Sequence, residues 1–273
     1  MLKSVCLIYK LVSIIVLVHV LAIFVQPVES FAHGNHTKYS RIIIDPLITH
    51  HSILEDEQRI NFFYFNRQRI AGKTSNGVGM SLELAYAFTD LFGVEAFVPF
   101  ASFSSSGFDE RGIGDIEIQQ LTLSFYRNFN FVLTGVMAFV LPTGSEARGL
   151  GSGQMLVEPH LFMDAAAGNW GIQANLIYGA ALSGESETEL EYNFSLSRTF
   201  FGEKFAWSGL IELNGGTALT GEESGESMLY LTPGLKWSHQ GWHIGAGVQL
   251  PVTDHRAADK IFLLQAGFHF SWK

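Results

Sequence analysis

The residue types that could do chemistry in this chain are a few histidines, scattered glutamates and one glycine-rich stretch. Gly149, Gly151 and Gly153 alternate with other residues, but they do not open a helix after a strand, so they are no dinucleotide-binding motif. His160 and His269 lie far apart, and no serine stands in a nucleophile elbow. We therefore predict no catalytic residues and no cofactor. An enzyme stays an alternative, because catalytic groups are brought together in space and not in sequence.

A second group of candidate ligands precedes the regular part of the chain. His33, His36, His50 and His51 fall between residues 33 and 56, where apolar residues do not alternate regularly. A zinc site would need cysteine, histidine or carboxylate at ligand spacing, and no such constellation accompanies them. The pattern favours a flexible periplasmic or lumen-filling segment, and we expect no metal site.

Composition restricts the class of protein. Of the 273 residues, 47% are hydrophobic and only 16% charged, against roughly 25% charged in ordinary soluble domains. Outside the N-terminus no apolar run approaches the roughly 20 residues of a spanning helix, so the apolar residues must be spread over strands. The formal charge of -9 and the lack of a basic patch exclude nucleic acid as a partner.

Residues 1–30 are predicted to be a signal peptide. Lys3 and Lys10 are followed by an apolar run over residues 11–25, and small residues around Ser30 suit a cleavage site. An anchor helix is the alternative, but the run is short for one. The only cysteine, Cys6, precedes the run, so the mature chain has no disulfide. We divide that chain into an N-terminal segment, residues 31–56, and a β domain, residues 57–273.

Residues 57–273 alternate with a period of two, which indicates half-buried strands. Between residues 170 and 180 every second residue is apolar: Trp170, Ile172, Ala174, Leu176, Tyr178 and Ala180. One slip in parity between Ile118 and Leu121 predicts a β-bulge. About twelve such strands can be counted, and long polar loops alternate with short turns. This is typical of a transmembrane antiparallel up-and-down β-barrel, although a soluble sandwich shows the same periodicity.

The tryptophans favour the membrane barrel over the sandwich. All five fall on the apolar parity, next to the short turns: Trp170, Trp207, Trp237, Trp242 and Trp272. Aromatic residues gather in this way at a membrane interface. Five core tryptophans of a sandwich would not be expected to collect at one end. We therefore expect an all-β barrel in the bacterial outer membrane.

The opposite parity carries the candidate site residues. In a barrel they would line the lumen: Glu83, Glu117, Gln173, Asn175, Glu191, Glu212, Lys236, Gln249 and His269. The glutamates either line a cation-tolerant pore or pair with Lys236 and Arg127, since buried charges are usually paired.

Three glycine-rich motifs carry a resemblance to a known family. They are Gly112-Ile113-Gly114-Asp115, Leu141-Pro142-Thr143-Gly144 and Gly149-Leu150-Gly151-Ser152-Gly153, and Pro46-Leu47-Ile48-Thr49 precedes the first strand. Their order and spacing resemble the outer-membrane transporter family named after the MetA pathway of phenol degradation, over roughly residues 45–273. The resemblance implies an outer-membrane barrel that takes up aromatic or other hydrophobic compounds, and it supplies no catalytic residues. Lys273 departs from the pattern, because outer-membrane proteins often end on the aromatic residue itself.

The sequence therefore predicts a passive outer-membrane channel for small hydrophobic or aromatic solutes. Its partners would be outer-membrane lipid, a small-molecule solute and the barrel-assembly machinery. Two alternatives stay open: a barrel enzyme resembling a lipase or an acyltransferase, and a structural or adhesive barrel. About twelve strands give a lumen narrower than that of the 16–18-stranded porins, and residues 33–56 are long enough to enter it.

Overall fold

The computed structural model describes residues 42, 44, 46–53, 55–70, 73–89, 92–105, 108–182, 188–202, 205–221 and 223–270. The predicted signal peptide, His33, His36, Trp272 and Lys273 lie outside these residues. One antiparallel sheet contains all the strands found there. No helix within the described ranges is long and apolar enough to cross a bilayer.

The strands follow one another in the sheet nearly in chain order. They are β1 (Glu57–Ile70), β2 (Lys73–Ala87), β3 (Gly93–Ser105), β4 (Phe108–Ile113), β5 (Ile116–Asn128), β6 (Phe131–Leu141), β7 (Leu156–Ala167), β8 (Trp170–Ala181), β9 (Glu189–Phe201), β10 (Ala206–Ala218), β11 (Ser227–His239), β12 (Trp242–Pro251) and β13 (Lys260–His269). A short 3-10 helix, η2 (Glu146–Arg148), lies between β6 and β7.

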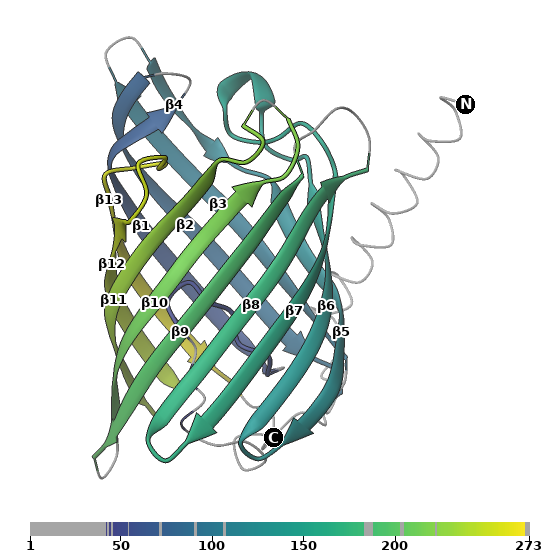
Figure 1. Cartoon of the computed structure of the whole chain (residues 1–273), viewed down its shortest axis with the longest axis vertical. Helices are drawn as coiled ribbons and strands as arrows, with labels where there is room; N and C mark the ends of the chain where they lie inside the picture. The colour runs from purple at the N-terminus through teal and green to yellow at the C-terminus, as the bar shows by residue number, and fades with distance from the viewer. Residues whose placement is uncertain are drawn as a thin grey trace. The chain divides into compact units, whose positions relative to one another are not determined.

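The sheet closes on itself, so it has no free edge. Strand β1 pairs with β13 from Glu57 opposite His269 to Asn66 opposite Lys260, and β2 pairs with β3. Strands β4 and β5 both pair with β3 and together fill one position, which makes a closed barrel of twelve positions (Figure 1). The predicted antiparallel barrel of about twelve strands is confirmed. So is the bulge, which lies between Gln119 and Leu121; a second irregularity near Tyr126 was not predicted.

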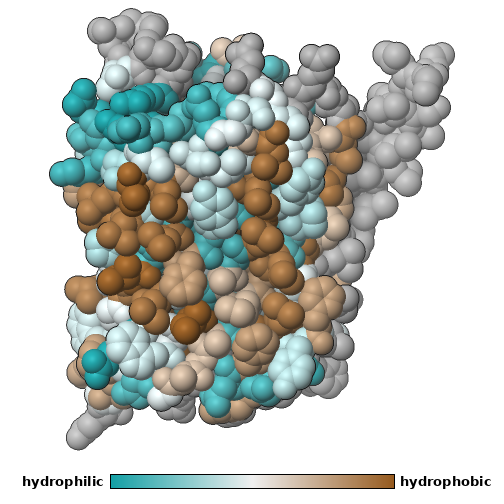
Figure 2. All heavy atoms as spheres, viewed as in Figure 1, coloured by the Kyte–Doolittle hydropathy of each residue, from teal (hydrophilic) through white to brown (hydrophobic). Residues whose placement is uncertain are grey.

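The polarity of the barrel is the reverse of that of a soluble protein. Leu176 and Trp207 on the outer face are 45% and 47% exposed, whereas Gln173 and Thr232 on the inner face are fully buried. Figure 2 shows the outer apolar side chains as a band between hydrophilic ends. In a sandwich the apolar faces would pack on each other, so the soluble alternative is excluded.

Tryptophans mark the short-turn end of the barrel. Trp170, Trp207 and Trp242 each begin or nearly begin a strand and are about half exposed, and Trp237 lies opposite Trp207. This confirms the predicted rim for the four tryptophans that the structure describes. The start of β1 and the end of β13 lie at the same end. Because outer-membrane barrels place short turns on the periplasmic side, we refer to this end as periplasmic.

The glycine-rich motifs meet at the extracellular end. The Asp115 carboxylate accepts hydrogen bonds from the Gly144 N–H (2.9 Å), the Ser152 N–H (2.6 Å) and the Ser152 hydroxyl (2.8 Å). A Cβ at Gly144 would collide with the Leu150 carbonyl, and one at Gly151 would collide with Asp115. The motifs therefore pin the loop between β6 and β7 against the break between β4 and β5.

The polarity of the outer face can be tested by placing a charge on it. Leu176→Arg, at mid-strand on β8, should lower the free energy of unfolding by about 2–4 kcal/mol, because the charge enters the bilayer. Urea titration of the protein folded in lipid vesicles measures this change. Glu191→Arg is the matched control, since this side chain is exposed on the inner face. Equal loss in both variants would contradict the assignment of the two faces.

Candidate functional site: the barrel lumen

The described part of the N-terminal segment, between residues 42 and 56, lies in the lumen (Figure 1). The Leu47 side chain packs against three glycines of β11 and β12. A Cβ at Gly234, Gly245 or Gly247 would come within 2.5 Å of a Leu47 methyl carbon, so only glycine leaves room for this side chain. Leu47 and Thr49 are buried, although they belong to no strand.

One carboxylate binds the turn of this segment. Glu212, fully buried on β10, accepts hydrogen bonds from the N–H groups of Leu47 (2.7 Å), Ile48 (3.2 Å) and Thr49 (2.7 Å). The Thr49 hydroxyl donates a further bond at 2.7 Å. Hydrogen bonds to an ionised acceptor are worth roughly 1.5–3 kcal/mol each. Three consecutive N–H groups directed at one carboxylate make Glu212 the main anchor of the segment.

Other lumen side chains bind the backbone of the same segment. Asn175 accepts a hydrogen bond from the His50 N–H (2.6 Å) and donates one to the His50 carbonyl (2.7 Å). Gln173 donates to the Ile44 carbonyl at 3.2 Å, and Asp164 accepts from the Ser52 N–H at 2.6 Å. Because the segment has no neighbouring strand, its backbone groups need these side-chain partners. These hydrogen bonds therefore fix the segment in the periplasmic half of the lumen, which we call the lower lumen.

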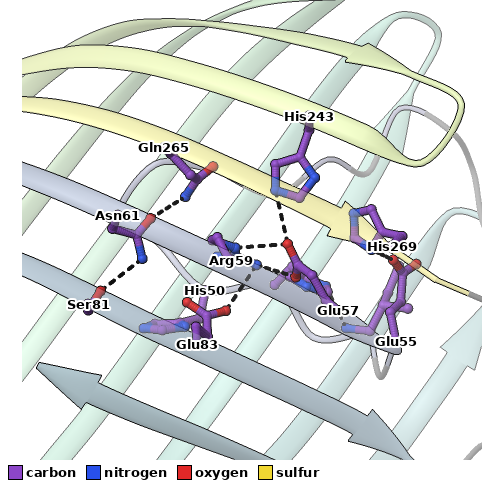
Figure 3. Close-up of polar contacts among 12 residues, drawn as sticks. His50, Glu55, Glu57, Arg59, Asn61, Ser81, Glu83, His243, Gln265 and His269 are labelled. Carbon is purple, nitrogen blue, oxygen red and sulfur yellow. Dashed lines mark hydrogen bonds and ion pairs between the residues drawn. The ribbon is translucent and has the colours of Figure 1, made fainter.

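An ion network marks the point where the segment becomes β1 (Figure 3). Arg59 donates from Nε (2.9 Å) and Nη2 (2.6 Å) to the two oxygens of Glu57, and its Nη2 also lies 3.2 Å from Glu83. His243 Nε2 lies 3.0 Å from Glu57, and His269 Nδ1 lies 2.8 Å from Glu55. The network joins β12, β13, β1 and β2 to the segment. A cavity of about 30 Å³ lies beside it, between the segment and β1 to β3, with room for about two waters.

The predicted site residues thus fall into separate groups. Gln173, Asn175 and Glu212 contact the N-terminal segment, while Glu83 and His269 belong to the ion network. Lys236 and Gln249 are buried on the inner faces of β11 and β12. Glu117 and Glu191 lie elsewhere, near the extracellular ends of β5 and β9.

Sequence reasoning missed an apolar wall in the extracellular half of the lumen, which we call the upper lumen. Phe63 and Phe65 of β1 pack against a buried cluster of Tyr230, Ala258 and Ile261. The signal was present, because both phenylalanines share the parity of polar Arg59 and Asn61 on β1. Aromatic residues on the polar parity of a barrel strand indicate an apolar part of the lumen.

The opposite wall of the upper lumen is acidic. The carboxylates of Glu117 and Glu158 lie close to the ring of His160, and Gln119 donates a hydrogen bond to Glu117 at 3.1 Å. Glu191 on β9 is exposed within the lumen. Phe162 connects this wall with the segment: its ring stacks on His50 (centroids 5.7 Å apart) and contacts His160 (5.3 Å).

No family model matches the chain, and no curated protein does. The fold is similar to those of solved structures, among them a channel and a porin. One is an outer membrane channel from Pseudomonas putida F1, with a TM-score of 0.56, 15% identity, and coverage of 83% of this chain and 100% of that one. The other is the NanC porin, with a TM-score of 0.52, 7% identity, and coverage of 79% and 100%.

The fold is that of an outer-membrane β-barrel. At these identities the similarity shows the fold alone. Together with the apolar outer band, it places the chain in the bacterial outer membrane. The resemblance to the MetA-pathway family stays a prediction.

The role of Glu212 as an anchor can be tested by hydrogen exchange. Glu212→Gln removes the negative charge. It also replaces one carboxylate oxygen by an N–H₂ group, which cannot accept a hydrogen bond from the backbone N–H groups of the segment. The segment should detach more easily by about 1.5–3 kcal/mol, so the amides of Leu47 and Thr49 should exchange roughly 10- to 100-fold faster. Glu191→Gln is the control, because Glu191 is exposed near the extracellular end of β9. Unchanged exchange in Glu212→Gln would contradict the anchor.

Proposed function

We propose that this chain is an outer-membrane channel for small neutral solutes, with hydrophobic or aromatic compounds as the preferred class. The observation that carries the proposal is a closed barrel whose lumen holds an ordered segment at the periplasmic half and an apolar wall above it. The similarity in fold to an outer membrane channel, over the whole of that chain, supports it. Outer-membrane lipid would contact the apolar band, and the barrel-assembly machinery would insert the protein.

The walls of the upper lumen suit such a solute. Phe63, Phe65 and Tyr230 offer aromatic contact on one side. The carboxylates of Glu117 and Glu158 on the other side would repel anions. A neutral aromatic solute gains contact with the apolar wall and meets no electrostatic barrier, whereas an aromatic carboxylate loses free energy at the acidic wall.

In this proposal the N-terminal segment controls passage through the barrel. Because Glu212 binds it by its backbone, weakening this anchor should open the lumen. Glu212→Gln should raise the flux of a small neutral aromatic solute into protein-containing vesicles several-fold over the wild type. Vesicle uptake and single-channel conductance in planar bilayers measure the change.

Two comparisons make this test decisive. Glu191→Gln makes the same chemical change outside the anchor and should leave the flux close to that of the wild type. A chain lacking residues 33–56 should conduct at least as well as Glu212→Gln. If folded protein shows no solute flux in any of these forms, the channel proposal fails, and an enzymatic or adhesive barrel takes its place.

Ion selectivity is a separate prediction. In the extracellular loops Arg148 pairs with Glu110 and Arg256 with Asp259, while Glu223 and Glu226 are exposed beside His255. The open form, Glu212→Gln, should therefore prefer K⁺ to Cl⁻, more strongly at low salt, where screening is weaker. Reversal potentials across a KCl gradient measure this preference. Anion selectivity at low salt would refute the electrostatic argument.

A further inference from the structure

The acidic wall contains a cluster of metal-ligating side chains from two strands that do not pair with each other, β5 and β7. One carboxylate oxygen each of Glu117 on β5 and Glu158 on β7, and a ring nitrogen of His160, all lie within 4.8 Å of one another. The intervening strand β6 places Ala138 between Gln119 and Glu158 in the register, and Ala138 is fully buried. Glu117 lies opposite Val140, two residues further along β6, so the two carboxylates meet diagonally across this strand.

His160 is the unusual member of the cluster. Its side chain is 2% exposed, and its Nε2 lies 3.5 Å from Glu158. Its other ring nitrogen, Nδ1, is buried and has no hydrogen-bond partner among the described residues. Nε2 is the ring nitrogen beside Glu158, and a neutral imidazole is the commonest metal ligand among side chains.

The cluster lies among carboxyl groups that repel one another when ionised. Glu191 adds its repulsion to that between Glu117 and Glu158. The ion pairs of Arg59, Arg67, Arg148 and Arg256 go to other carboxylates. Buried charges are normally paired or coordinate a metal. A bound cation would supply a counter-charge to Glu117 and Glu158, as Arg59 does for Glu57 and Glu83.

We propose that Glu117, Glu158 and His160 form a binding site for a divalent transition-metal cation of the Zn²⁺ class. The site lies in the upper lumen, near the contact of Phe162 with His50 of the N-terminal segment. One nitrogen and two carboxylate oxygens are a ligand set that zinc accepts. Imidazole also selects against Mg²⁺ and Ca²⁺, which prefer oxygen ligands alone. The proposal does not depend on solute flux, because binding is measured on the folded barrel itself.

The test is titration of the purified full-length protein in detergent with Zn²⁺, followed by calorimetry, with Co²⁺ absorption as a probe of nitrogen coordination. The wild type should bind one ion at this site, more tightly than it binds Ca²⁺. His160→Gln and Glu158→Gln each remove a ligand. Each should weaken Zn²⁺ binding by more than the roughly 10- to 100-fold that outer-shell changes cost. Migration that changes on heating shows that each variant is folded.

A second cluster on the surface provides the control. Glu223, Glu226 and His255 also lie within 4.8 Å of one another, on exposed extracellular loops. His255→Gln should leave the high-affinity site and its Co²⁺ spectrum unchanged. The proposal is overturned if Zn²⁺ affinity is unaltered in both His160→Gln and Glu158→Gln, if it is lost in His255→Gln, or if Ca²⁺ binds as tightly as Zn²⁺.

Discussion

The constraint on which the rest of the structure depends is that backbone groups inside a bilayer must find hydrogen-bond partners within the protein. The pairing of β1 with β13 satisfies it, because it leaves the sheet without an edge. Once the sheet is closed, each strand has one face towards lipid and one towards the lumen. This is why Leu176 is exposed while its neighbours Asn175 and Ile177 are buried.

Closure creates a second requirement inside the barrel. Polar side chains that point inward lose bulk water and need partners of their own. Glu212, Asn175 and Asp164 find them in the backbone of the N-terminal segment, which has no strand partner either. The side chains of the barrel wall and the backbone of the segment thus provide each other's hydrogen-bond partners. In the proposed channel, weakening the bonds of Glu212 to the segment would open the periplasmic half of the lumen, because this carboxylate accepts from three consecutive N–H groups.

The upper lumen owes its proposed selectivity to an asymmetry between its walls. Phe63 and Phe65 make one wall apolar, and Glu117 and Glu158 make the other acidic. A neutral aromatic solute and a metal cation would use different walls. The glycine-rich motifs, which carried the resemblance to a transporter family, have a structural role here: they fix a loop to Asp115.

The sequence by itself determined the class of fold, because the period of two and the tryptophan rim are local signals that each strand carries independently. It also determined the bulge after Ile118 and the inward parity of residues such as Gln173 and Glu212. It could not determine what those side chains bind. Leu47 is 165 residues from Glu212, and Glu117 and His160 lie on strands separated by β6. Only closure of the barrel brings such residues together, because their partners are set by the register and curvature of the whole sheet and not by neighbours in the chain.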